Sequence, residues 1–329
     1  MRCDDNHPMR HSSGFTLVEL LLVIFLLSSL ALVTTLFVDN ANEQYRFETT
    51  RTRLEQIRRA IVGDTSRTLN GQPEISGFVA DMGRLPANLQ ELIELGGQAE
   101  WNLHTVNTSG LSPVVVELHG GWRGPYLEAV PESDGMLAFR DGWGNAGAAP
   151  NYGWIGLTED AGALLLQSLG SDGIADGDGG SLEMYAKDYP SSGLSLVVPN
   201  DYRMSLNNGL TVTFNQEATD PAPTSVYLRL YFVNDGVINT NFDLDSLNFP
   251  SISGVRTVNV SFDTTDPKNH MALMGRYAAV VMCDVNNNGD PSDDIVFDGD
   301  CTSNPVHTNP YYFTLVPRRQ LPNIPWHIQ

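Results

Sequence analysis

The sequence has few basic residues, and this shortage limits the partners that the protein can bind. Its 329 residues include 19 Lys and Arg against 39 Asp and Glu, which gives a net charge of −20 at pH 7. Proteins bind nucleic acid mainly by neutralising its phosphates with Lys and Arg. We therefore expect no nucleic-acid partner, whereas such an acidic surface suits the binding of divalent cations.

Catalytic signatures are also missing. The histidines after residue 14 stand apart from one another, so there is no HExxH zinc motif, and no G-x-S-x-G elbow occurs. Residues 142–147 fit the glycine pattern of a dinucleotide site, but Ala148-Ala149-Pro150 follow, where that site needs a long helix. We predict that the protein is not an enzyme. A catalytic triad assembled from distant residues is the alternative.

Charge is absent from one long stretch near the N-terminus. Leu20 to Val38 is a run of 19 residues without a charged side chain, which is the length that a helix needs to cross a bilayer core. Proline is absent from residue 9 to residue 72, so nothing in this region breaks a helix. We predict one helix over 15–69, with a transmembrane part at 15–38 and an amphipathic part after it.

A short motif stands where this apolar stretch begins. Gly14-Phe15-Thr16-Leu17-Val18-Glu19 follows a polar leader, and the small pair Ser13-Gly14 precedes the apolar run. A secretory signal peptide would place them after that run. Glu19 is a carboxylate at membrane depth, where an unpaired charge is costly, so it is a candidate functional residue.

The motif resembles the cleavage and methylation signal of type IV prepilins and pseudopilins. The resemblance implies that a prepilin peptidase cuts after Gly14 and that the new N-terminal residue, Phe15, is N-methylated. It also implies that Glu19 pairs with the N-terminal amine of a neighbouring subunit. The chain departs from many pilins because its N-terminal helix contains no proline. An ordinary single-span anchor is the alternative.

The same resemblance implies a location and a set of partners. We expect a single-pass protein of the bacterial inner membrane, with its head in the periplasm or on an extracellular filament. Its expected partners are the prepilin peptidase, the inner membrane and other pilin or pseudopilin subunits. Residues 1–14 would be the leader that is removed.

Residues 70–190 read as a small α/β head with several turn motifs. In order, these are Leu85-Pro86, where a short helix is expected to begin, Gly124–Leu127, Asp141–Asn145 and Gly170–Gly173, which follows an apolar strand at 164–169. This order resembles the head of the major pseudopilin of the type II secretion system. An insertion at 97–121 departs from it.

Residues 191–329 differ in composition from the head, because they consist of short runs rich in Val, Tyr, Phe and Thr that are separated by turn residues. Such runs predict an antiparallel β-sandwich, which makes the whole chain α+β. The residues from Arg318 onward read as irregular. The expected strands are 194–198, 210–214, 226–233, 255–262, 277–282, 295–297 and 311–316.

Cysteine is scarce. Cys3 lies in the leader, and Cys283 and Cys301 lie in the part expected outside the cytoplasm, where disulfides persist. We predict a Cys283–Cys301 disulfide, and a loop of that size stabilises the fold by about 3 kcal/mol in the chain-entropy description. Two buried free thiols are the alternative.

Two acidic loops are candidate calcium sites. Gly170–Gly180 alternates Asp and Gly, and in the resembled family this loop binds calcium; its candidate ligands are Asp172, Asp176 and Asp178. The second loop matches the opening of an EF-hand, and its candidate ligands are Asp284, Asn286, Asn288 and Asp290. The closing Glu of an EF-hand is missing there, because Ile295 occupies its position after Asp293 and Asp294. Solvated acidic turns are the alternative for both loops.

Together these features predict a structural subunit of a type II secretion pseudopilus or of a related type IV filament. A minor type IV pilin that presents its C-terminal domain as an adhesin is one alternative. A membrane-tethered hydrolase is the other. The head motifs favour a major subunit, whereas the extra C-terminal domain favours a minor one because it would crowd a filament.

Overall fold

The structure is a computed structural model that describes residues 16–64, 66–69, 72–108, 114–132, 135–175, 184–191, 194–206, 210–216, 226–244, 254–260, 271–284, 293–297, 301 and 309–327. Side chains are described for these residues except 33–40, 69, 72–73, 214–216, 240–244, 254–260 and 327. The chain is an α+β protein, as predicted.

The longest element is helix α1 (Leu17–Val62). Its sequence contains no Gly and no Pro, so no residue interrupts the backbone hydrogen bonds. The helix ends before the predicted residue 69, because Gly63 adopts a φ of +71° and its N–H donates to the Arg59 carbonyl. A Cβ at Gly63 would lie 2.1 Å from the Ser76 carbonyl oxygen, so only glycine fits this turn.

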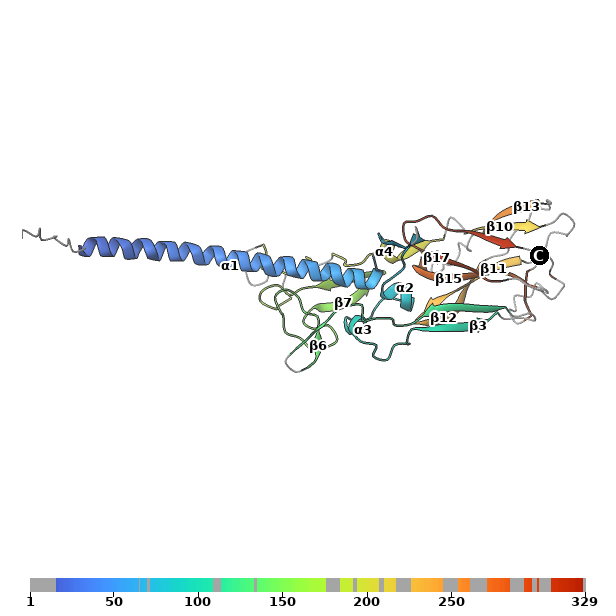
Figure 1. Cartoon of the computed structure of the whole chain (residues 1–329), viewed down its shortest axis with the longest axis horizontal. Helices are drawn as coiled ribbons and strands as arrows, with labels where there is room; N and C mark the ends of the chain where they lie inside the picture. The colour runs from blue at the N-terminus through green and yellow to red at the C-terminus, as the bar shows by residue number, and fades with distance from the viewer. Residues whose placement is uncertain are drawn as a thin grey trace, which may run out of the picture.

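Figure 1 shows that the N-terminal half of α1 projects away from the body of the protein, whereas its C-terminal half lies against the other elements. The apolar residues of the C-terminal half face these elements: Leu54, Ile57 and Ile61 are at most 5% exposed. They form a core with side chains of residues 75–166, and each buried side chain of this size stabilises the fold by about 1.5–3 kcal/mol.

The head beside α1 consists of short elements. The expected helix near Pro86 begins later, at Gln90, and another helix that the sequence did not predict precedes it. The apolar strand expected at 164–169 is β8. The elements are β1 (Thr68–Leu69), β2 (Gln72–Pro73), α2 (Phe78–Met82), α3 (Gln90–Ile93), β3 (Asn102–Asn107), β4 (Val115–Gly120), β5 (Val130–Pro131), β6 (Leu137–Ala138), β7 (Ile155–Asp160) and β8 (Ala163–Gln167). They form the antiparallel pairs β1–β2, β3–β4, β5–β6 and β7–β8.

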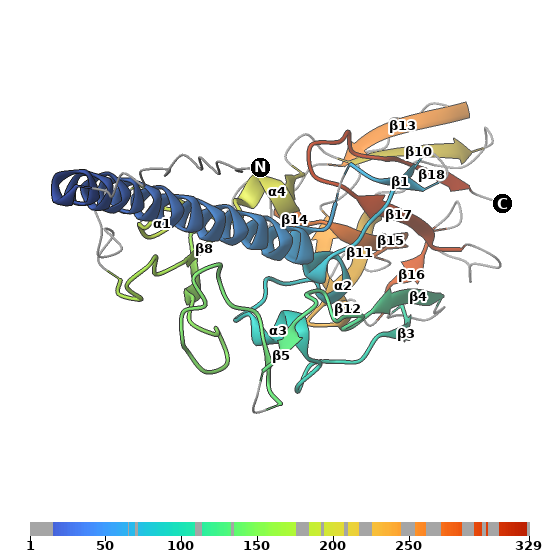
Figure 2. The same cartoon turned by 60° about the vertical axis from the view of Figure 1, so that its left-hand side comes forward.

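The C-terminal part contains two larger sheets, which lie in separate layers in Figures 1 and 2. One has the strand order β13-β10-β18, and the other has the order β12-β11-β15, with β16 and β17 both paired to β15. A third, smaller pair joins β9 to β14. The elements are α4 (Pro199–Tyr202), β9 (Arg203–Ser205), β10 (Leu210–Gln216), β11 (Val226–Asn234), β12 (Val237–Leu244), β13 (Gly254–Val260), β14 (Met271–Leu273), β15 (Gly275–Cys283), β16 (Ile295–Val296), β17 (Tyr311–Leu315) and β18 (Asn323–His327).

Most of the expected strands are present, and three expectations about this part were wrong. Residues 194–198 form no strand, because they lead into α4 and only Val197 makes an isolated bridge, with Leu164. The end of the chain, read as irregular, contains β18. This strand pairs with β10 in parallel, so the sheets are not wholly antiparallel. Strand β12 had not been predicted.

The buried side chains form two cores, and each core contains residues from both the head sequence and the C-terminal sequence. Strand β4 lies in the head sequence, yet its Val116 and Leu118 belong to the core of the C-terminal sheets. Conversely, Met274 and Val316 pack into the core around α1. The boundary at residue 190 stays a prediction, and side chains from both sides of it interlock.

A buried carboxylate ties the head to the C-terminal sheets. Asp81 of α2 has a fully buried side chain, and its oxygens lie 3.1 Å from Arg123 and 3.5 Å from Arg276 of β15. The Tyr126 hydroxyl also donates to Asp81, at 3.2 Å. Burial raises the pKa of Asp81, although the two guanidinium groups act in the opposite direction. Both arginines also lie over the ring of Trp101.

Candidate functional site

The described chain begins two residues after the predicted cleavage site. Gly14 and Phe15 lie outside the described residues, so their predicted roles stay predictions. Thr16 is the N-cap of α1 and forms a capping box with Glu19. The Glu19 carboxylate accepts from the backbone N–H and from the hydroxyl of Thr16, both at 2.9 Å. The carboxylate is therefore held at the N-terminal end of the helix, beside the residue that follows Phe15.

The first turns of α1 are apolar and exposed. The large apolar residues from Leu17 to Leu32 are 44–78% exposed. Contiguous apolar surface of this kind marks a segment that contacts other protein or lipid. Among helices formed by described residues, none is long and apolar enough to cross a membrane. The predicted span of 15–38 includes Phe15 and the side chains of 33–38, which lie outside the described part.

Two of the head motifs meet in space. Asp141 is buried, and one of its carboxylate oxygens accepts from the Asn145 side chain and from the Ser168 hydroxyl. The Asn145 side-chain amide also donates to the Gly170 carbonyl at 3.0 Å. The 141–145 turn therefore fixes the start of the acidic loop at 170–180. Ser168 takes part in this network and was not singled out by its sequence.

Within that acidic loop, only one of the three candidate ligands is described. Asp172 is exposed, and its Oδ1 accepts from the backbone N–H of Ile174 at 2.9 Å. Asp176 and Asp178 lie outside the described residues. The geometry of Asp172 is that of a local turn stabilised by its own side chain, and calcium at this loop stays a prediction.

The second acidic loop brings together a different set of carboxylates from the one predicted. Carboxylate oxygens of Asp284, Asp293 and Asp294 lie within 4.8 Å of one another. Asn286, Asn288 and Asp290 lie outside the described residues. Asp293 and Asp294 stand just after the predicted EF-hand-like ligands in the sequence, but they were not predicted to be ligands.

Strand pairing explains why these three carboxylates converge. Cys283 at the end of β15 is paired with Ile295 at the start of β16, in an antiparallel register. Asp284 and Asp294 are the next residues outward on the two strands, so the register places them opposite each other. An acidic doublet immediately before an apolar strand was the signal available in the sequence.

Asp294 is the most buried member of the cluster, with a side chain only 4% exposed. Its Oδ2 accepts from the Tyr227 hydroxyl and lies 3.6 Å from the guanidinium of Arg229. Arg229 in turn donates to the Tyr227 hydroxyl at 2.7 Å. Burial raises the pKa of Asp294, the Tyr227 hydrogen bond and Arg229 lower it, and the carboxylates of Asp284 and Asp293 raise it further.

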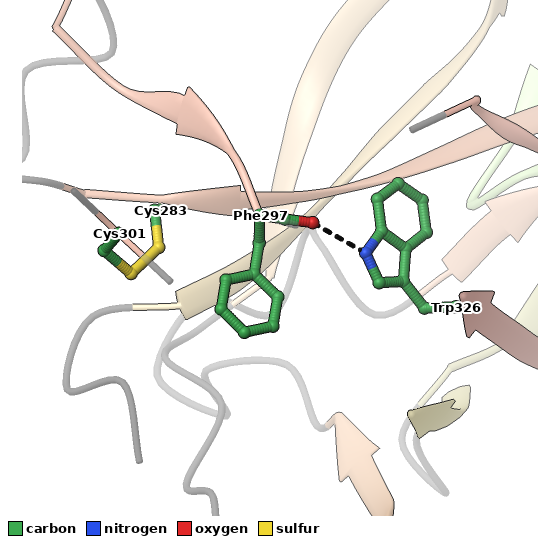
Figure 3. Close-up of a disulfide and its surroundings, with 4 residues drawn as sticks. All are labelled: Cys283, Phe297, Cys301 and Trp326. Carbon is green, nitrogen blue, oxygen red and sulfur yellow. Dashed lines mark hydrogen bonds between the residues drawn. A yellow bond between two sulfur atoms is a disulfide. The ribbon is translucent and has the colours of Figure 1, made fainter. Parts of the chain in front are cut away.

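The predicted Cys283–Cys301 disulfide is present, with 5.7 Å between the two Cα atoms. Cys283 is fully buried in the C-terminal core. Figure 3 shows the disulfide close to Phe297, whose carbonyl accepts from the indole N–H of Trp326 at 2.8 Å. The disulfide and this hydrogen bond hold the segment that follows the acidic cluster against β15 and β18.

Comparison with known proteins identifies the N-terminal segment only. Residues 9–35 match the family described as the prokaryotic N-terminal methylation motif. No curated protein and no solved structure matches the chain. The motif indicates a type IV pilin-like protein that a prepilin peptidase processes and that assembles with other pilin subunits. It places the protein at a membrane or on a filament.

Proposed function

We propose that the protein is a structural subunit of a type II secretion pseudopilus or of a related type IV filament. It is held in the bacterial inner membrane with its leader in the cytoplasm until the peptidase cuts between Gly14 and Phe15. The observation that carries this proposal is the combination of the methylation motif with a helix whose large apolar residues at 17–32 are exposed. Such a segment needs lipid first and neighbouring subunits afterwards.

Glu19 serves the assembly step in this proposal. Its carboxylate sits at the start of the helix, where cleavage creates a new amine on Phe15. A carboxylate and an ammonium group in an apolar surrounding are each costly alone, and pairing lowers the cost of both. Within one subunit Glu19 accepts from Thr16; in the filament it pairs with the Phe15 amine of a neighbour.

The test is to replace Glu19 by Ala in the host bacterium. Glu19→Ala should be cleaved normally, since the cut lies five residues earlier in the chain, but should enter filaments poorly. Glu55→Ala is the matched control, because Glu55 is an exposed carboxylate on the same helix that pairs only with Arg59 among the described residues. Glu55→Ala should assemble normally. Normal incorporation of Glu19→Ala would overturn the pairing role.

The head motifs support a likeness to the major pseudopilin, because the 141–145 turn and the start of the 170–180 loop are joined by the contacts of Asp141 and Asn145. A minor pilin with an adhesive C-terminal domain is the second candidate. It is favoured by the position of the C-terminal sheets, which lie at the opposite end of the molecule from the free end of α1 (Figure 1). That position would display them on a filament tip.

Deletion of the gene separates the two candidates. Loss of protein export through the outer membrane is expected for a pseudopilus subunit, with surface adhesion unchanged. Loss of adhesion with normal export would identify the minor pilin instead. Counting the protein in purified filaments against the most abundant subunit then distinguishes a major from a minor component.

A further inference from the structure

We infer that the carboxylates of Asp284, Asp293 and Asp294 form a calcium site at the end of the β15–β16 hairpin. The inference is independent of filament assembly, because it concerns the opposite end of the molecule. It also differs from an EF-hand, whose ligands would follow Asp284 at fixed positions in one loop. Here the ligands come from both sides of a strand pair.

The fold forces the three carboxylates together. The Cys283–Ile295 register fixes Asp284 against Asp294, and Asp293 is the neighbour of Asp294 in the chain. The disulfide from Cys283 adds a covalent link at the same strand end. Three like charges within 4.8 Å repel one another, and Arg229 lies beside one of them, Asp294, at 3.6 Å. A bound divalent cation would convert this repulsion into attraction.

An independent observation points to a ligand. The Asp294 side chain is 4% exposed, and its Oδ1 is buried without a hydrogen-bond partner. Buried carboxylate oxygens are rarely left without a partner, because the loss of water is then uncompensated. Tyr227 and Arg229 occupy Oδ2. Oδ1 is therefore the oxygen that Asp294 can offer to an ion shared with Asp284 and Asp293.

The donor set selects calcium among the common metals. All three described donors are carboxylates, and Cys283 is held in the disulfide, so the cluster offers neither thiolate nor imidazole to zinc. Magnesium usually keeps several waters and binds through one or two carboxylates. Calcium takes six to eight oxygens in adaptable geometry, so three carboxylates, one of them buried, suit calcium best, with water completing its shell.

The bound ion would stabilise the strand pair at the edge of the C-terminal core. Cys283 and Ile295 are both core residues, and the ion would hold the two strands together directly beyond them. Because the site needs the folded strand pair, calcium should stabilise the folded state over the unfolded chain.

The test uses the full chain and calcium itself, with isothermal calorimetry and thermal unfolding as readouts. The wild-type protein should bind calcium and show a higher Tm in calcium than in EDTA. Asp293→Asn should weaken calcium binding roughly tenfold or more and lose most of the Tm increase. Asp160→Asn is the matched control, because it removes an exposed carboxylate of β7 that lies outside both acidic loops, and it should behave like the wild type.

A second ligand variant keeps the test decisive if one variant fails to fold. Asp284→Asn removes a less buried ligand than Asp294 and should also weaken calcium binding, with circular dichroism confirming the fold. Absence of calcium binding at millimolar concentration would overturn the inference. So would unchanged affinity in both ligand variants, and so would a loss of binding in a third variant, Asp172→Asn, alone, which would place the ion in the 170–180 loop.

Discussion

The two halves of helix α1 differ in whether their apolar side chains are buried. In the C-terminal half, Ile57 and Ile61 are fully buried against the head, while Glu55 and Arg59 on the other face stay exposed. In the N-terminal half, the large apolar residues of 17–32 surround the helix, and all are exposed. A helix with one apolar face can be covered by one folded head, whereas a helix that is apolar all round must be enclosed by other molecules.

The difference assigns a separate task to each half. The C-terminal half is part of the folded subunit, so substitutions of its buried side chains should change the free energy of unfolding. The N-terminal half contacts lipid or neighbouring subunits, so substitutions there should change assembly. Paired substitutions in the two halves test this division.

The largest effect is expected from Ile57→Ala. Ile57 is fully buried in the core around α1, so its truncation should lower the free energy of unfolding by about 2–5 kcal/mol. Leu22→Ala is the control, because Leu22 is 57% exposed in the first half and should leave unfolding unchanged. Chemical denaturation in detergent measures both. Equal losses from the two variants would contradict the division.

Arg53→Ala should have the next largest effect. The Arg53 guanidinium donates to the carbonyls of Arg140 and Asp141, at 2.5 and 2.9 Å, and so fastens the helix to the head. Losing both bonds should lower the free energy of unfolding by about 2–3 kcal/mol. Arg59→Ala removes only an exposed ion pair with Glu55 and should cost about 0.5 kcal/mol or less. Denaturant titration of the two variants side by side decides whether the contrast holds.

A smaller effect is expected from Thr50→Val, with Thr49→Val as its control. Both hydroxyls donate to the helix carbonyl four residues earlier, but only Thr50 also accepts from a head residue, the N–H of Gly142, at 2.9 Å. Thr50→Val should therefore lower the free energy of unfolding by about 1 kcal/mol more than Thr49→Val does. If the two variants lose the same stability, the contact with Gly142 does not hold the helix to the head.

The sequence predicted those features that depend on neighbouring residues. The absence of Gly and Pro predicted a long helix, and alternating apolar residues predicted most of the strands. Strand β18 was missed because Pro325 interrupts the usual strand pattern and because its partner, β10, lies far away in the chain. The parallel pairing of Val212 with Ile324 is a property of the tertiary fold that no local pattern contains.

The candidate sites show the same limit. The methylation motif is local, so its residues could be named from sequence alone. The acidic cluster depends on the register between β15 and β16. The EF-hand pattern assigns ligands by their spacing along one loop, so it predicted Asn286, Asn288 and Asp290 rather than Asp293 and Asp294. The Cys283–Cys301 disulfide was predictable because the two residues were the only cysteines left after the leader.

The mass of the protein taken from assembled filaments shows whether α1 enters the filament after cleavage and methylation. If the first half of α1 is the assembly segment, assembled protein begins at a methylated Phe15 and lacks residues 1–14. Assembled protein that retains the leader through Gly14 would contradict the account.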